Sequence, residues 1–173
     1  KVSRGGEEHA VLFDGAVYSQ NVLHNADLLG VDLSRVEAVV LSHGHFDHFM
    51  GLTGILGRLN RGIPLVLHPD AFLARRFNVP GIGTAEPLQL DEAALQAAGA
   101  SVSRNAGPSL LGDGLILVLG AVERVTAFEK GFPWAEANVN GEWVADPFRD
   151  DQGLAVLVRH KGLVVIGGCS HAG

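Results

Sequence analysis

The sequence predicts one α/β domain over residues 1–173, and three observations support this. Hydrophobic residues make up 47% of the chain, which is enough to build a core. A charged fraction of only 18% and 23 glycines indicate a compact, loop-rich protein rather than a disordered one. Short apolar runs typical of buried strands alternate with segments whose apolar residues recur at helical spacing.

The first half of the chain predicts two strand–helix units. Residues 10–13 are a short apolar run ended by Asp14-Gly15, as expected of a buried strand and turn. Ser19 can cap a helix whose apolar face extends to residue 29. Residues 36–41 predict the next strand, and the spacing of apolar residues from 52 to 59 predicts a helix after it.

Further strands and helices follow up to residue 119. Residues 64–68 predict a strand, and Asp70 then predicts the N-cap of a helix that runs through Phe77. An alanine-rich segment, residues 91–98, predicts another helix. Residues 115–119 form a clear buried strand.

The last third of the chain combines a long loop with a hairpin. Residues 129–150 show no steady period, and a loop of that length inside a domain is usually functional or mobile, so we expect a flap over the site. Residues 154–158 and 163–166 predict two strands, joined through residues 159–162 as a hairpin.

Charge and composition exclude several classes of partner. A net charge of −6 without a Lys/Arg cluster argues against nucleic acid. No apolar stretch approaches the ~20 residues that cross a bilayer, so we expect no membrane partner. A single cysteine, Cys169, excludes an intrachain disulfide and fits a reducing compartment, so we expect a cytoplasmic protein. The oligomeric state stays open.

The six residues 43–48, His-Gly-His-Phe-Asp-His, carry most of the chemical information. His43 and His45 stand two residues apart after an apolar strand and can point the same way, whereas Asp47 and His48 can face a second point nearby. Imidazole nitrogen and carboxylate oxygen suit zinc, iron or manganese, and the excess of imidazole favours zinc. The alternative, a surface loop that happens to be rich in histidine, does not account for the preceding buried strand.

The HxHxDH motif, with Leu12-Phe13-Asp14 upstream of it, resembles the metallo-β-lactamase-fold superfamily. Further segments resemble its dihydropterin ribofuranosylaminobenzene phosphate synthase-like subfamily; they are His24-Asn25-Ala26 with residues 28–33, residues 124–129, Asp150-Asp151-Gln152 and residues 168–173. The resemblance implies a four-layer αββα sandwich whose C-terminal part lies beyond this chain. Lys1 is not a methionine, so we expect a domain incomplete at both ends, with one apolar sheet face left uncovered.

The resemblance also implies a binuclear metal site. His43 and His45 belong to the first metal position, and Asp47 and His48 to the second. His171 follows a buried strand and completes the site, the alternative being a capping or core histidine. Asp14 is expected to hold the metal loop rather than to bind metal.

Two further ligand assignments stay open. Cys169 stands where relatives place a bridging Asp or Cys, and its alternative is a small buried core residue. Asp151 can ligate, orient a ligand histidine, or be a solvated loop acid. By contrast, His9, His24 and His68 are expected to be structural.

The function that follows is metal-dependent hydrolysis, or transfer, at a phosphoryl or acyl centre. A metal-activated hydroxide would be the nucleophile, with Asp47 orienting it. We expect two zinc ions, with manganese or iron as alternatives, and a small-molecule substrate that is phosphorylated or pterin-like. Arg124 and Glu129 could frame its entrance, Arg124 by pairing with a phosphate; a surface ion pair is the alternative.

Two rival functions remain. One is an iron-dependent oxidoreductase on the same fold, a branch of the superfamily that carries Glu at the position of His45. The other is a non-catalytic binding module, against which the complete HxHxDH set argues. Because one fold hosts many chemistries, the site has to decide.

Overall fold

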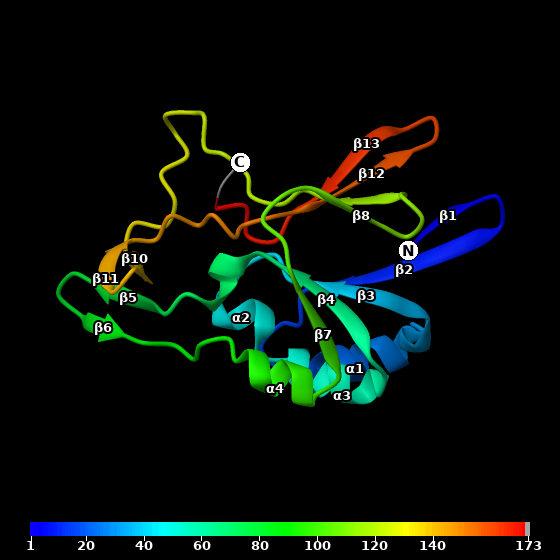
Figure 1. Ribbon diagram of the computed structural model, residues 1–173, viewed down its shortest axis with the longest axis horizontal. Helices are drawn as coiled ribbons and strands as arrows, with labels where there is room; N and C mark the ends of the chain where they lie inside the picture. Colours follow the sequence, from blue (N-terminus) through cyan, green and yellow to red (C-terminus); the bar gives the residue numbers. More distant parts are fainter. Residues whose placement is uncertain (172–173) are drawn as a thin grey trace.

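The apolar runs in the first half of the chain pair into one five-stranded sheet. The structure, a computed structural model, describes residues 1–171 (Figure 1). In hydrogen-bonded order the strands are β1 (Val2–Arg4), β2 (Glu7–Phe13), β3 (Val36–Val40), β4 (Ile63–Leu67) and β7 (Ala100–Arg104). All except β1 run parallel, so the loops that leave β2, β3 and β4 emerge at the same edge of the sheet.

Helices cover one face of this sheet (Figure 1). The helical segments are α1 (Ser19–Leu28), η1 (Leu33–Arg35), α2 (Phe46–Phe49), α3 (Leu52–Leu59), η2 (Pro69–Phe72) and α4 (Glu92–Ala97). Val39 and Leu65 from the sheet pack in one core cluster with Leu52, Leu56 and Leu95 from the helices. The predicted helices near residues 19, 52 and 91 are confirmed, but the predicted capping by Ser19 is wrong, because Ser19 is the first helical residue and α1 has no side-chain cap. The Asp91 side chain accepts hydrogen bonds from the backbone N–H groups of Ala93 and Ala94.

A second, antiparallel sheet packs on the other face. Its strands, in order, are β13 (Gly162–Ile166), β12 (Leu154–Val158), β9 (Ile116–Val118) and β8 (Ser109–Leu111). Successive residues of a strand point to opposite faces, so Val40 faces this sheet and packs with Val118 and Leu154, whereas Val39 faces the helices. The α–β–β layering confirms the predicted α/β class. Leu163 of β13 is 67% exposed, so an apolar surface of this sheet is open in the described residues.

A third sheet overturns two expectations. It consists of β11 (Glu142–Ala145), β10 (Ala135–Val139), β5 (Arg75–Val79) and β6 (Gly83–Ala85). The predicted helix from Asp70 through Phe77 is wrong, because only one 3₁₀ turn forms and residues 75–77 then pair with β10.

The expected loop over residues 129–150 is wrong in part, because β10 and β11 form a hairpin within it. Asn140 and Gly141, with φ of 55° and 92°, supply the positive angles that such a two-residue turn requires. Among the described residues, no helix has the length and apolar character to cross a membrane.

Candidate metal centre

The loop that joins β3 to α2 carries His43 and His45 of the motif, whereas Asp47 and His48 lie on α2 itself. The loop is packed from several sides. Leu41 continues from the sheet, with its N–H donating to the carbonyl of Val66 over 3.0 Å, and Ser42 and His43 are fully buried. Gly44 lies so close to the segment after β4 that a Cβ there would overlap the carbonyl oxygen of Ala71. The backbone path of the motif therefore requires glycine at this position.

Three imidazole rings converge beside this loop. The ring centroids of His43 and His45 lie 4.6 Å apart. The ring centroid of His171 lies 5.0 Å from that of His43 and 5.1 Å from that of His45. The Nε2 atoms of His43 and His171 are buried, and among residues 1–171 they have no hydrogen-bond partner. Buried polar atoms rarely stay unpaired, and three imidazoles suit a divalent metal. We call these three residues the first metal position.

The protonation state of His43 and His171 favours metal binding at this position. Burial, reinforced by the neighbouring histidines, lowers the pKa of His43 strongly. Burial also lowers the pKa of His171, to about 4. Both rings are therefore neutral near pH 7, which is the form that binds a metal ion.

Asp47, His48 and Cys169 lie together next to the first position. Nε2 of His48 is 3.1 Å from Sγ of Cys169 and 3.7 Å from Oδ2 of Asp47. Potential ligand atoms of His43, Cys169 and His171 all lie within 4.8 Å of one another, so the two groups adjoin. We call Asp47, His48 and Cys169 the second metal position. Burial and the charges of nearby carboxylates raise the pKa of the Cys169 thiol, and a bound metal would deprotonate it.

Asp14, which directly follows β2, binds the loop that carries His43 and His45. Its carboxylate accepts hydrogen bonds from the Ser42 N–H at 2.7 Å and from the Ser42 hydroxyl at 2.8 Å. Nδ1 of His48 lies 2.7 Å from the same carboxylate. Burial would lower the pKa of His48, but the hydrogen bond and charge of Asp14 raise it. These contacts direct Nε2 of His48 toward the second position.

The Asp150-Asp151-Gln152 segment lies against the loop from the opposite side. Gln152 donates its backbone N–H to the carbonyl of Ser42 and its side-chain amide to that of Leu41. Asp151 is 2% exposed, and its charge raises the pKa of both His48 and Cys169. A solvated loop acid, one of the three open interpretations of Asp151, therefore does not fit; a ligand role and an orienting role both remain.

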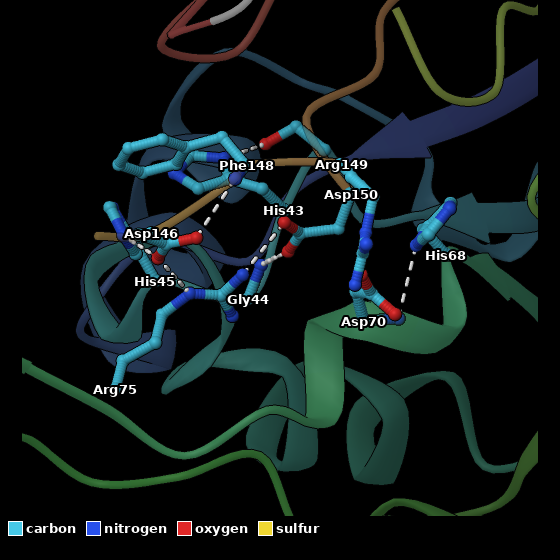
Figure 2. A network of polar contacts seen from close by, with 11 residues as sticks. His43, Gly44, His45, His68, Asp70, Arg75, Asp146, Phe148, Arg149 and Asp150 are labelled. Carbon is cyan, nitrogen blue, oxygen red and sulfur yellow. Dashed lines mark hydrogen bonds and ion pairs between the residues drawn. The ribbon is translucent and has the colours of Figure 1, made fainter. Parts of the chain in front are cut away.

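A buried ion-pair network lies beside the first metal position (Figure 2). The sequence analysis does not predict it. Arg75, the first residue of β5, donates from Nε to Asp146 and from Nη2 to Asp150, both over 2.7 Å. Oδ2 of Asp150 accepts the Gly44 N–H over 2.7 Å, and Oδ2 of Asp146 lies 3.7 Å from Nε2 of His45. Residues so far apart in sequence give no local pattern that could have revealed this network.

The two residues predicted to frame the substrate differ in their contacts. Glu129 accepts hydrogen bonds from the backbone N–H groups of Val125 and Thr126, so it shapes the segment 125–129. The guanidinium of Arg124 lies 5.3 Å from the ring centre of Phe148, which itself stacks on His171 at 4.4 Å. Nε and Nη2 of Arg124 are buried and have no hydrogen-bond partner within the described part of the chain.

The histidines predicted to be structural lie in other surroundings. Nδ1 of His9 is 3.0 Å from Glu37, and Nδ1 of His68 accepts the Asp70 N–H at the start of η2. His24 is exposed on α1. Of the C-terminal motif, Gly168 to His171 are described, and Ala172 and Gly173 lie outside the described residues.

Comparison with known families settles what kind of chain holds this site. Residues 4–116 match the model of the metallo-beta-lactamase superfamily. The chain belongs to this superfamily. The matched stretch includes the HxHxDH loop but ends before the superfamily-like Cys169 and His171 segment.

Two curated relatives match all or nearly all of this chain. A protein of Methanocaldococcus jannaschii named 7,8-dihydropterin-6-methyl-4-(beta-D-ribofuranosyl)-aminobenzene-5'-phosphate synthase is 32% identical over all of the chain and 60% of its own length. A second M. jannaschii protein, uncharacterized, is 30% identical over 94% of the chain and 59% of its own. The chain thus spans about three-fifths of these relatives.

Two solved structures share the fold of this chain. A metal-dependent hydrolase of the beta-lactamase superfamily superposes with a TM-score of 0.73 at 28% identity, covering 98% of this chain and 62% of that one. A quorum-quenching N-acyl homoserine lactone lactonase superposes with a TM-score of 0.52 at 13% identity, covering 92% and 55%. At that identity the second likeness concerns the fold alone.

Proposed function

We propose that this protein is a hydrolase of small phosphorylated molecules that uses two metal ions, zinc in preference to manganese or iron. The observation that carries the proposal is the convergence of two adjoining donor groups. Within them, the buried Nε2 atoms of His43 and His171 have no partner among the described residues. Buried polar atoms are rarely left unpaired, and a bound metal ion would pair both of these.

We assign one metal ion to each group of side chains. His43, His45 and His171 would hold the first ion, and Asp47, His48 and Cys169 the second, with Asp151 beside it as a ligand or an orienting carboxylate. Bound ions of this kind lower the pKa of water and stabilise negative charge that develops on the substrate.

Asp47 is suited to handle the proton of the attacking water. Its side chain is 48% exposed, whereas the side chain of His48 beside it is 15% exposed. The carboxylate therefore lies where water and substrate have access, and it can orient the water through a hydrogen bond and accept its proton.

Arg124 is our candidate for the phosphate group of the substrate. Its guanidinium, with buried N–H groups that have no partner among the described residues, lies 5.3 Å from the ring centre of Phe148, and Phe148 stacks on His171 of the first metal position. A guanidinium with free donors is a strong ligand for phosphate oxygens. Glu129 fixes the segment that follows Arg124 and so supports this arrangement. The relative whose name is that of a (beta-D-ribofuranosyl)-aminobenzene-5'-phosphate synthase supports a phosphorylated substrate. Hydrolysis by this chain, and its location in the cytoplasm, are our proposals.

His45→Ala, with His24→Ala as the matched control, tests the proposal. His24 is an exposed histidine on α1, away from both metal positions. We expect His45→Ala to lose metal and hydrolytic activity in a screen of phosphoesters, thioesters and lactones, and His24→Ala to keep both. Unchanged turnover in His45→Ala would contradict the proposal. Bound iron with an absorption spectrum in the visible range would favour the oxidoreductase, and no metal uptake would favour a binding module.

A further inference from the structure

Arg75 lies beside the first metal position. Through Asp146 and Asp150 it connects β5 to the segment after β11 and to the loop that carries His43 and His45. It is 5% exposed and divides its guanidinium between two buried carboxylates, those of Asp146 and Asp150. Two parallel contacts of 2.7 Å fix both acids relative to β5. Such a planar fork gives geometric precision that a lysine ammonium lacks.

Each carboxylate passes this constraint on to the site (Figure 2). Asp150 uses its second oxygen to accept the Gly44 N–H, between His43 and His45. Asp146 uses one oxygen to accept the Phe148 N–H over 2.9 Å, and Phe148 stacks on His171. Its other oxygen faces Nε2 of His45 at 3.7 Å. Arg75 is thus linked, through Asp146 and Asp150, to residues that contact or adjoin all three imidazoles of the first metal position.

The fit around Arg75 is close. The Cβ of any residue other than glycine at position 44 would meet Nη1 of Arg75 as well as the Ala71 carbonyl. Asp146 is 5% exposed and pairs with Arg75 over 2.7 Å. A buried carboxylate depends on such a partner for charge compensation.

We propose that Arg75 is a positioning residue that sets the geometry of the first metal position through Asp146 and Asp150. The inference rests on the proposed function, because it requires that metal binds there. Oδ2 of Asp146 lies 3.7 Å from Nε2 of His45, an atom that has no hydrogen-bond partner among residues 1–171. Carboxylates that orient a ligand histidine in this way change metal affinity without touching the metal.

The test compares Arg75→Met and Arg75→Lys with Arg76→Met. Arg76 is the next residue of β5 and pairs with Glu136 on the neighbouring strand at 2.5 Å, so its replacement also removes an ion pair from this sheet. Zinc affinity is measured without denaturant, by competition with a chromophoric chelator. A separate urea unfolding curve establishes that each variant is folded under these conditions. Cobalt substitution reports the geometry of each position by its absorption spectrum.

We expect Arg75→Met to weaken zinc binding by about 10- to 100-fold, and Arg75→Lys to restore only part of the loss. Arg76→Met should keep wild-type affinity even if it lowers stability. The absorption of a cobalt–thiolate contact at Cys169 should persist in Arg75→Met, because the second position lies outside the network.

Wild-type zinc affinity in folded Arg75→Met would overturn the inference. If that variant does not fold, Asp150→Asn decides instead: it removes charge from the network but keeps an acceptor for Gly44, and unchanged zinc affinity would again overturn the inference. Failure of the wild-type protein to bind any metal would contradict the proposed function itself, so the two failures are distinct.

Discussion

Replacing Asp14 with alanine should destabilise the metal-free protein through the loop that it holds. Ser42 is fully buried, and its N–H and hydroxyl both donate to Asp14. Each buried donor left without an acceptor costs about 1–3 kcal/mol. The Ser42 hydroxyl keeps a contact of 3.0 Å with His43, which reduces its share. We therefore expect the free energy of unfolding to fall by about 2–5 kcal/mol.

Urea unfolding of the metal-free protein, followed by circular dichroism, measures this loss. Asp14→Asn is the matched variant, because it keeps an acceptor oxygen for the Ser42 N–H while it removes the charge beside His48. It should lose less stability than Asp14→Ala. A difference between Asp14→Ala and wild type within about 0.5 kcal/mol, the range of ordinary surface substitutions, would refute the reasoning.

Three further predictions concern single residues of the site. Gly44→Ala should lower the unfolding free energy by about 1–3 kcal/mol, because the added methyl overlaps the Ala71 carbonyl; an unchanged thermal midpoint would contradict this. Phe148→Ala should cost about 3–5 kcal/mol, since the ring is 1% exposed and stacks on His171; it should also weaken zinc binding, as competition with a chelator would show. Cys169 of the metal-free protein should react with a thiol reagent more slowly than a free cysteine at mildly alkaline pH, because its raised pKa leaves less thiolate at a given pH. Its reaction rate should keep rising beyond the ordinary thiol pKa of about 8.5, and a half-maximal rate below that value would show that the local charge was misjudged.

The parts of the fold that the sequence predicts are those with local signals. The strand to Leu41 and the helix from Leu52 follow from apolar spacing over a few residues, and the structure has both. The wrong helix over residues 70–77 shows the limit of such signals. Residues 75–77 pair with 135–137, some sixty positions later, and this pairing outweighs the local tendency. The Asn140-Gly141 pair was a usable turn signal within the segment read as a loop.

The candidate site divides in the same way. The motif points to His43, His45, Asp47 and His48 because neighbouring residues carry the potential ligand atoms, and these residues lie close together in the structure. Arg75 and Asp146 could not be found from the sequence, because their role exists only where β5 meets the segment after β11. A buried arginine between two acids has no characteristic spacing along a chain, so only the three-dimensional arrangement identifies it.

The decisive measurement is the number of metal ions per polypeptide, determined by elemental analysis after purification and after addition of zinc. We expect two ions per chain in the wild-type protein, a reduced number in His45→Ala and an unchanged number in His24→Ala. A wild-type protein that holds no metal and takes up none on addition would contradict the proposed metal centre, because the converging side chains would then bind no ion.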